Sequence, residues 1–359
     1  MELFLDNLVF TIQHTGGVSV YWYELLRGLC AAQLPVRFLN AGLNAENIFE
    51  QRLNYAAYPC VRESWIPPAC LRYLPLRYKL PRAALFHGGY LRVSPQQDVV
   101  NILTIHDLAH ERKLATRFPR ALVNQQQKRY GIRRADGIIC ISESTRRELL
   151  HFYPDTDPSR VCVVHHGIAD TFFPLAEKQH TEAPYVLYVG GRRQYKNFDM
   201  AVAAVQQLPV QYTLVAVGGE QWSVQELQGL KHLLDGRFRV VPRASPQELN
   251  RLYNQAWCLL YPSAYEGFGF PPGEAMKAGC PVVAARTTSL PEVVGDAGLL
   301  VDEISPTAFA AEILRLEQPV LRQQLVKDGL ARARLFTWEK SVQATIGFYQ
   351  QCWHHKFSS

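Results

Sequence analysis

Short apolar segments alternate with amphipathic, helix-like segments along almost the whole chain. In the first half we predict strands in the apolar segments at 2–5, 36–40, 84–88, 99–105, 137–142 and 161–166. In the second half we predict strands at 185–190, 212–218, 238–242, 258–262, 281–285 and 298–302. Helices are expected between them, among others after Gly17, around 117–134 and from Ser144. Because the strands are apolar at nearly every position, they suit parallel sheets buried on both faces, and the alternation predicts an α/β protein.

A polar, proline-containing segment at 169–184 divides this pattern into two halves. Its composition is typical of an interdomain linker, and a length of 359 residues fits two domains of about 150 residues each. Open parallel sheets bind ligands beyond the carboxyl ends of their strands. Residues that directly follow predicted strands are therefore the first candidates for a functional site.

The composition excludes several classes of protein. With 48% hydrophobic and 19% charged residues, the chain is not a disordered protein. Its eight cysteines form no C-x-x-C pair and several lie in apolar segments, which argues against a disulfide framework and against a zinc site. No segment suits a transmembrane span, and the acidic start MELFLDNLVF does not resemble a signal peptide. We expect a cytoplasmic protein, with room for a peripheral position at the inner face of the membrane.

The positive charge is concentrated in the first half. The chain carries a net charge of +6, of which +5 belongs to the first 170 residues. This surplus fits an anionic partner and equally a solvated basic surface. The segment 60–83 combines Arg72, Arg77 and Lys79 with aromatic and aliphatic residues, a mixture that suits an anionic membrane surface or a lipid-diphosphate acceptor. A loop packed on the first domain explains the same segment, since four prolines interrupt it.

The segment 261–285 carries the most chemical information. After a predicted strand a loop presents Glu266, and Gly267 and Gly269 leave the backbone uncovered before a helix that ends near Gly279. Amide groups at such a helix start suit an anion such as a diphosphate. Glu266 and Glu274 would be repelled by that anion unless they bind neutral hydroxyl groups. The pattern indicates a nucleoside diphosphate that carries a sugar, although a structural Gly/Pro loop with one capping glutamate explains the segment as well.

With these residues the chain resembles the retaining glycosyltransferases of family 4, whose hallmark is the E-x7-E motif. The resemblance covers nearly the whole chain and implies the GT-B fold, in which two Rossmann-like parallel-sheet domains face each other across a cleft. The implied parts are an acceptor-side domain at 1–172, a donor domain at 173–339 and a helix at 340–359 that crosses back to the first domain. The residues implied to bind the donor are Glu266 at the sugar, Glu274 at the ribose, and the backbone of Gly267, Phe268, Gly269 and Phe270.

A basic loop follows the strand that opens the second domain. In GGRRQYKNF, residues 190–198, a Gly-Gly turn precedes Arg192, Arg193 and Lys196, and cations at this place can neutralise a leaving diphosphate. An exposed basic loop has the same sequence pattern. The family resemblance implies a basic pair that binds the donor diphosphate, and we assign it to Arg192 and Lys196, with Arg193 as a further candidate. The first arginine stands one position later here than in most members.

In the first domain, His106 and Asp107 follow the strand predicted at 99–105, and Gly16 and Gly17 open a helix. A histidine in this position fits a structural role as well as a functional one. The resemblance implies that His106 reaches the donor sugar or its leaving group and that Gly16 and Gly17 approach the donor phosphate. Asp107 is expected to orient the backbone or His106. His87, which follows another strand, is a second candidate for the acceptor side.

Two polar segments are interpreted as structural. Ser142 precedes a predicted helix, in which Thr145 and Glu148 have the spacing of a capping box. Asp155 and Asp157 form a D-x-D pattern, as in metal-dependent glycosyltransferases, but their proline-flanked surroundings predict a turn. We therefore expect no bound metal and no other cofactor, because cations and helix amides can offset the charge of the leaving group.

The prediction is a retaining, metal-independent hexosyltransferase that moves a sugar from a nucleoside diphosphate to a glycan or lipid-linked saccharide in cell-surface polysaccharide synthesis. GDP-mannose is the predicted donor, with mannose as the transferred sugar. No nucleic acid is expected as a partner. Since no covalent nucleophile is evident, the resemblance favours attack by the acceptor on the face that the diphosphate leaves. The catalytic residues are predicted to be His106, Glu266, Arg192 and Lys196. The alternatives are a non-catalytic, nucleotide-sugar-binding subunit and a GT-B-like epimerase or phosphorylase.

Overall fold

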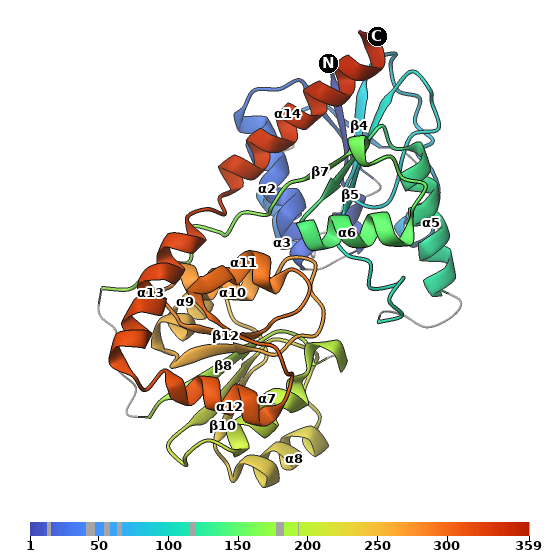
Figure 1. Ribbon diagram of the computed structural model, residues 1–359. Coiled ribbons are helices and arrows are strands. Elements are labelled where there is room, and N and C mark those ends of the chain that lie inside the picture. Colours follow the sequence, from blue (N-terminus) through green and yellow to red (C-terminus); the bar gives the residue numbers. More distant parts are fainter. Residues whose placement is uncertain are drawn as a thin grey trace. The chain divides into compact units, whose positions relative to one another are not determined.

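The computed structural model describes residues 1–12, 16–40, 47–53, 58–62, 67–114, 120–176, 183–192 and 194–358. The chain forms two compact units, one of Met1–Gly167 with Trp338–Ser359 and one of Ile168–Thr337 (Figure 1). The chain thus leaves the first unit after Gly167 and returns to it at Trp338. The predicted boundaries were 172 and 339.

The first unit is built on a seven-stranded parallel sheet in the order β3-β2-β1-β4-β5-β6-β7. Its strands are β1 (Leu3–Asp6), β2 (Val36–Asn40), β3 (Cys60–Arg62), β4 (Leu85–Gly88), β5 (Val100–Ile105), β6 (Gly137–Cys140) and β7 (Val161–Val163). Its α-helices are α1 (Leu8–Ile12), α2 (Gly17–Ala31), α3 (Ile48–Arg52), α4 (Pro68–Leu71), α5 (Arg120–Arg134), α6 (Glu143–Phe152) and α14 (Trp338–Phe357). Helices α2 and α14 cover one face of the sheet, and α5 covers the other (Figure 1).

The second unit contains a six-stranded parallel sheet in the order β10-β9-β8-β11-β12-β13. Its strands are β8 (Tyr185–Val189), β9 (Thr213–Val217), β10 (Phe238–Val241), β11 (Cys258–Tyr261), β12 (Val282–Ala285) and β13 (Leu299–Val301). Its α-helices are α7 (Phe198–Gln206), α8 (Val224–Leu234), α9 (Pro246–Gln255), α10 (Phe270–Lys277), α11 (Leu290–Val294), α12 (Pro306–Arg315) and α13 (Pro319–Ala333). A buried apolar core lies between the sheet and α7, α8 and α12.

The two sheets confirm the predicted α/β class with two Rossmann-like domains. Every predicted strand is present, and the structure adds β3, which the sequence pattern did not indicate because it has three residues and a polar end. Strand β3 pairs with β2 at the edge of the first sheet. Among the described residues, no helix has both the length and the apolar character needed to cross a membrane.

Helix α14 is part of the core of the first unit. Its Phe348, Tyr349 and Cys352 are buried, and it packs on α2 and on strands β5 and β6. Two glycines permit this close approach, since a Cβ atom added to Gly28 would lie 2.4 Å from a Val342 methyl group and one added to Gly137 would lie 2.5 Å from the Cys352 sulfur. The C-terminal helix therefore closes the first sheet rather than the second.

Candidate functional site

The sheet of the second unit has one switch point, between β8 and β11. From β8 the chain proceeds outward through β9 and β10 on one side, then returns to begin the other side with β11. Both strands next to β8 run parallel to it. Ligands of open α/β sheets bind at the carboxyl ends of the strands where this reversal occurs. The loop after β8 contains Arg192 and Lys196. The loop after β11 contains Glu266.

Lys196 and Glu266 meet at this switch point. The ammonium group of Lys196 lies 2.6 Å from Glu266 Oε1, and the hydroxyl group of Tyr261, at the end of β11, donates to the same oxygen at 2.6 Å. Lys196 Nζ also lies 3.3 Å from the Tyr261 oxygen. Within the described part of the chain, Glu266 Oε2 has no hydrogen-bond partner. One carboxylate oxygen is therefore fixed by the protein while the other remains able to accept from a ligand hydroxyl.

The loop that carries Glu266 is fixed by the loop after β12. Thr288 Oγ1 accepts from the amide of Glu266 at 2.9 Å, and Ser289 Oγ lies 2.9 Å from the carbonyl oxygens of both Glu266 and Phe268. Thr288 has a positive φ of 44°, which is rare for a β-branched residue. These contacts hold the backbone of the loop and so fix the position of Glu266.

Helix α10 begins as the sequence predicts. Gly269 has φ 102°, and a Cβ atom there would lie 2.8 Å from Leu290 Cδ2, so the turn into the helix requires glycine. The proline pair of this segment occupies the first turn. The Phe268 side chain is buried against Phe270 and Phe336. The Phe268 side chain is therefore part of the apolar packing, and donor binding by the backbone of Gly267, Phe268, Gly269 and Phe270 stays a prediction.

Glu274 lies one turn into α10 and is hydrogen-bonded to Tyr253. The Tyr253 hydroxyl group donates to Glu274 Oε2 at 2.9 Å. Burial raises the pKa of Glu274 to about 7, an effect that the hydrogen bond from Tyr253 partly opposes. Burial also raises the pKa of Tyr261, and the carboxylates of Glu266 and Glu274 both add to the effect. Tyr261 thus lies within electrostatic reach of both predicted glutamates.

Arg192 contacts Trp222 and the residues around it. Its guanidinium carbon lies 3.8 Å from the centre of the Trp222 ring, and its Nε lies 3.2 Å from Glu226 Oε1. Its two terminal nitrogens donate to the carbonyl oxygens of Glu220 and Gln221. Sequence reasoning did not single out Trp222, because an isolated tryptophan after a strand gives no signal. Arg193, the further candidate, lies outside the described residues.

His106 lies where the first sheet ends, directly after β5. Its ring centre is 5.0 Å from that of Tyr21 and 5.7 Å from that of His166, which is buried. Burial lowers the pKa of His106 to about 4, and neighbouring Asp107 opposes the shift. The imidazole is therefore neutral at pH 7. The Asp107 carboxylate accepts from the amide of Ala109 at 3.1 Å, in agreement with the expected backbone role.

Gly16 and Gly17 stand at the start of α2, where Gly16 precedes the first helical residue. The Gly16 carbonyl oxygen accepts from the Ser19 hydroxyl group at 2.9 Å. Thr15, which precedes them, lies outside the described residues.

His87 is not available for a ligand. It is fully buried, its Nδ1 lies 2.5 Å from the Tyr349 hydroxyl group and its Nε2 lies 2.8 Å from Thr104 Oγ1. The expectation that it lines the acceptor side is therefore wrong. Burial lowers its pKa to about 3, so that it is a neutral core residue that links β4 to α14.

The remaining polar motifs are structural. Ser142 caps α6 by accepting from the amide of Thr145 at 3.0 Å, so the cap lies three residues before the predicted capping box. Glu148 instead contacts Arg112 at 2.5 Å. Asp157 accepts from the amide of Ser159 at 2.9 Å in the predicted turn. Within the described residues, no three His, Cys, Asp or Glu side chains lie close enough together to hold a metal ion.

Two family models match adjoining parts of the chain. The model described as Glycosyltransferase Family 4 matches residues 15–172, and the model described as Glycosyl transferases group 1 matches residues 172–331. The chain is 33% identical over 229 residues to O-antigen chain mannosyltransferase B of Escherichia coli, covering 59% of this chain and 60% of that protein. It is 32% identical over 247 residues to a D-inositol 3-phosphate glycosyltransferase of Nocardioides, with coverage of 60% and 54%. The matched region thus spans little more than half the length of these relatives.

Solved structures resemble the whole chain. Sucrose-phosphate synthase from Thermosynechococcus elongatus superposes with a TM-score of 0.79 at 22% identity, covering 99% of this chain and all of that one. The lipopolysaccharide glycosyltransferase WaaG superposes with a TM-score of 0.68 at 15% identity over the full length of both chains. At these identities the likeness establishes the shared fold.

Proposed function

This chain belongs to the family 4, group 1 glycosyltransferases with the GT-B fold, and on that premise we propose that it is a retaining hexosyltransferase that uses a nucleoside-diphosphate sugar. The observation that carries the proposal is the contact between Lys196 and Glu266 at the switch point of the second sheet. It brings a cation suited to phosphate and a carboxylate suited to hydroxyl groups to the place where such sheets bind nucleotides.

Each group has a role that its surroundings support. Glu266 Oε2 accepts from a hydroxyl group of the donor sugar, while Oε1 stays with Lys196 and Tyr261. Glu274 binds the ribose hydroxyl groups. The backbone of 267–270 and the Lys196 ammonium group stabilise the negative charge that grows on the diphosphate as the bond to the sugar breaks, a kind of interaction that dominates in many enzymes.

Arg192 and His106 complete the proposed set. Each of the three guanidinium nitrogens of Arg192 donates one hydrogen bond within the protein. Because the guanidinium has five N–H groups, two remain that a phosphate oxygen would bind. His106 is neutral at pH 7, so it acts as a hydrogen-bonding group for the donor sugar and not as a cation. Gly16 and Gly17 offer backbone approach to the donor phosphate. The acceptor hydroxyl attacks from the side on which the diphosphate leaves, and its proton passes to that phosphate.

We propose mannose as the sugar, in line with the activity in the name of the Escherichia coli relative. The acceptor is a glycan or lipid-linked saccharide of a cell-surface polysaccharide, and no metal is required. The protein acts in the cytoplasm, at the inner face of the membrane when the acceptor is lipid-linked.

The test is donor binding and transfer by Glu266→Ala and Lys196→Ala. We expect both variants to lose at least about a hundredfold in transfer, the order found when one group that stabilises a developing charge is removed. Donor-induced thermal stabilisation, measured with GDP-mannose and with UDP-, GDP- and dTDP-linked hexoses, should be smaller than in the native chain. Glu303→Ala, an exposed glutamate of the same unit, is the matched control.

The same experiment separates the alternatives. A native chain that binds a donor but transfers nothing to any acceptor would be the non-catalytic subunit. Conversion of the donor without an acceptor would indicate an epimerase. Transfer that survives in Glu266→Ala at the native rate would refute the proposed site.

A further inference from the structure

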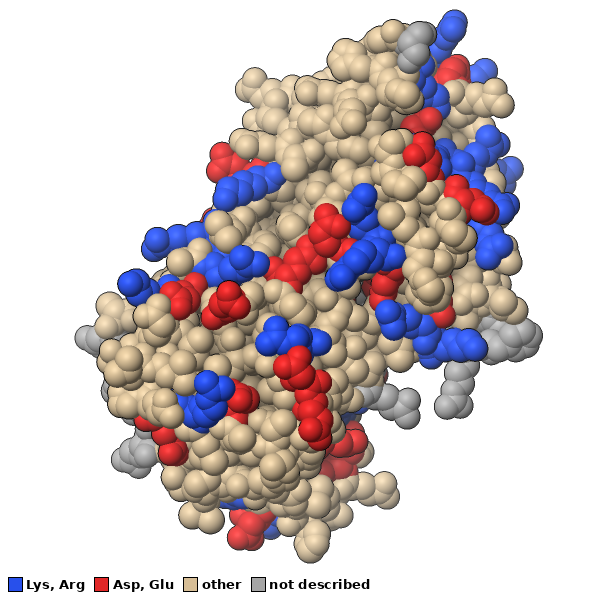
Figure 2. Space-filling view, in the orientation of Figure 1, with Lys and Arg blue, Asp and Glu red and all other residues tan. Residues whose placement is uncertain are grey.

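A buried lysine contacts the loop that follows β5. Lys128 of α5 is 3% exposed and is the one buried lysine among the described residues. Other basic side chains gather on the surface over α5 and α6 (Figure 2), and Arg129 and Arg133 of α5 are exposed. Lysines are almost never fully buried unless their charge is paired. The partners of Lys128 therefore show what its charge does.

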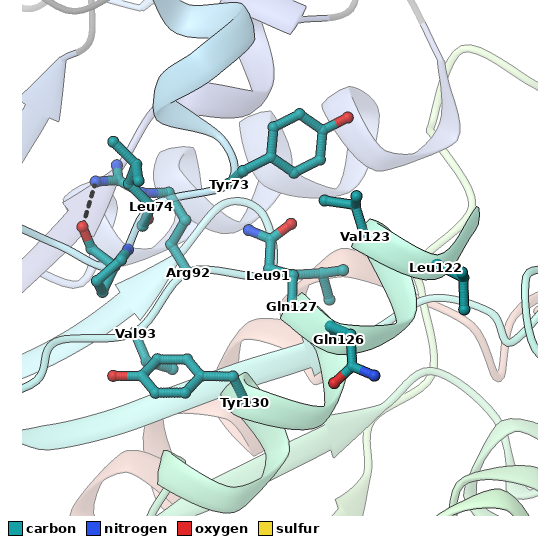
Figure 3. Close-up of a pocket in the computed structure, with 11 residues that line it drawn as sticks. Tyr73, Leu74, Leu91, Arg92, Val93, Leu122, Val123, Gln126, Gln127 and Tyr130 are labelled. Atoms are coloured by element: carbon teal, nitrogen blue, oxygen red, sulfur yellow. Dashed lines mark hydrogen bonds between the residues drawn. The ribbon is translucent and has the colours of Figure 1, made fainter. Parts of the chain in front are cut away.

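Helix α5 has different surroundings on two sides. Val123, Gln126 and Tyr130 line a pocket of about 540 Å³ that residues 73–75 help to form (Figure 3). Lys128 is not among the residues that line this pocket. It lies two positions from both Gln126 and Tyr130, which is about half a turn of a helix with 3.6 residues per turn. Its side chain is therefore on the side of α5 that faces the loop after β5.

The Lys128 ammonium group makes two contacts with this loop. It donates to the carbonyl oxygen of Asp107 at 3.0 Å and lies 2.9 Å from Glu111 Oε2. The hydroxyl group of Tyr153, which directly follows α6, donates to the other oxygen of Glu111 at 2.6 Å. The loop is thus joined to α5 and to the end of α6. Because Asp107 directly follows His106, these contacts fix the backbone beside the imidazole.

The charge of Lys128 also acts on His106. Burial is the main cause of the lowered pKa of His106, and the positive charge of Lys128 lowers it further, while Asp107 opposes both. The other titratable groups that face His106 are Tyr21 of α2, His166 after β7 and His87 of β4. Lys128 is therefore one of the groups that keep the imidazole neutral.

The ion pair of Lys128 and Glu111 is not explained by stability alone. Their side chains are 4% and 5% exposed, so both charges are desolvated. Replacing a buried ion pair by apolar residues of similar volume is often neutral or stabilising. What an apolar pair could not supply is a donor for the Asp107 carbonyl group and a fixed positive charge near His106.

We propose that Lys128 is a positioning residue for His106: it fixes the backbone that follows the imidazole and supplies a buried positive charge that disfavours the imidazolium form. This rests on the proposed function, because it takes His106 to bind the donor sugar as a neutral group. His106 is only half-buried, so a ligand can reach it. Lys128 acts through His106 and touches no substrate itself.

The first measurement is the titration of His106 in the full chain, followed by NMR with ¹³C-labelled histidine and assigned with His106→Asn. Lys128→Met/Glu111→Gln removes the positive charge without leaving an unpaired carboxylate, and the new amide oxygen can accept from Tyr153. We expect the titration midpoint of His106 to rise by about one pH unit. Lys128→Arg keeps the charge, so the midpoint should stay at its native value.

The second measurement is transfer between pH 5 and 8. In Lys128→Met/Glu111→Gln we expect kcat to fall about tenfold at pH 7, because His106 is displaced, with a change in donor KM of less than about twofold. The acid limb of kcat should move to higher pH by the same amount as the NMR midpoint. Lys128→Arg should keep the native acid limb and recover only part of the rate, because its guanidinium differs in shape from the ammonium group.

Lys356→Met/Asp136→Asn is the matched control. Lys356 of α14 donates to the carbonyl oxygen of Val99 at 2.8 Å and lies 2.8 Å from Asp136 Oδ1. It therefore makes, before β5, the same kind of contacts that Lys128 makes after β5. We expect a native His106 midpoint and a native acid limb in this control. A shift there equal to that of the Lys128 variant would overturn the inference.

The remaining outcomes separate this inference from its premise. An unchanged His106 midpoint in Lys128→Met/Glu111→Gln overturns the inference, and so does a native rate with a native acid limb. If Glu266→Ala still abolishes transfer, the proposed function stands in both cases. If the double variant does not fold, Lys128→Arg decides: a native midpoint with a reduced rate supports the inference, and a native rate overturns it. If the native chain transfers nothing, the proposed function fails, and the NMR titration alone decides whether Lys128 acts on His106.

Discussion

At the scale of single residues, Glu274 combines a stability cost with a role in the proposed site. Its pKa in the folded chain is about 7 against an ordinary value near 4.5, because the carboxyl group is buried. The folded state therefore holds a proton that the unfolded state has lost between these values, and the stability of the second unit falls as the pH rises from 4.5 to 7.

Glu274→Gln should remove this dependence. We expect the variant to unfold with a free energy up to about 3 kcal/mol above the native chain at pH 8 and equal to it at pH 4.5. Urea titrations at the two pH values, with hydrogen exchange of α10 as a local readout, check the result. Donor affinity should fall in the same variant. A gain in stability of equal size at both pH values would contradict the shifted pKa as its cause.

For Arg192 and Lys196, the sequence predicts the basic loop but not the partners of each side chain. The sequence indicated a basic pair after β8, and the structure places Lys196 against Glu266. The sequence could not indicate that Arg192 stacks on Trp222. The two residues are thirty positions apart and meet only because β8 and β9 are neighbours. Motif spacing describes one loop, whereas side-chain partners depend on how two loops meet.

At the scale of elements, α14 illustrates close packing that depends on one glycine. Gly28→Ala would bring a new methyl group to 2.4 Å from Val342, so α2 and α14 must separate or Val342 must move. We expect Gly28→Ala to destabilise the native chain by about 1 kcal/mol, because overpacking outweighs the better helix propensity of alanine.

The sign should reverse in a Val342→Ala background. There only the Cβ atom of residue 342 remains, at 3.1 Å from the added methyl group, so a shift of a few tenths of an ångström accommodates it. Gly28→Ala should then stabilise by up to about 1 kcal/mol through helix propensity. Thermal or urea unfolding of the four variants completes the cycle. Additive effects of the two substitutions would show that Gly28 and Val342 do not restrict each other.

Most elements were predictable because buried parallel strands are apolar throughout and glycines and prolines separate them. The exceptions have physical reasons. Strand β3 is short and lies at the sheet edge, where its pairing depends on β2 and not on its own pattern. The buried position of His87 depends on Tyr349, 262 residues away, and no local pattern reports such a contact.

At the scale of the whole molecule, the two units respond to pH in opposite directions. In the first unit His87, His106 and His166 are uncharged at pH 7, with their pKa values lowered by burial. Below pH 6.5 the unfolded chain binds protons at these histidines and the folded chain does not. Their contribution to the stability of the first unit is therefore complete above pH 6.5 and is lost as the pH falls.

From pH 7.5 to 5.5 we expect the first unit to lose about 4 kcal/mol from these three histidines, while the second unit gains from protonation of Glu274. Hydrogen exchange followed by mass spectrometry, corrected for the intrinsic effect of pH, measures the two units separately in one sample. His354→Asn, an exposed histidine of α14, should leave the profile unchanged. A parallel decline of both units would refute the assignment of opposite signs.

The return of the chain at Trp338 also decides how the molecule bears tension. Residues 1–167 and 338–359 belong to the first unit, and residues 168–337 are inserted between these two segments. A force applied near residues 2 and 358 acts across β1 and α14 and bypasses the second sheet until the first has ruptured. In an optical trap the first unit should therefore open first, and only then should the six-stranded sheet experience load.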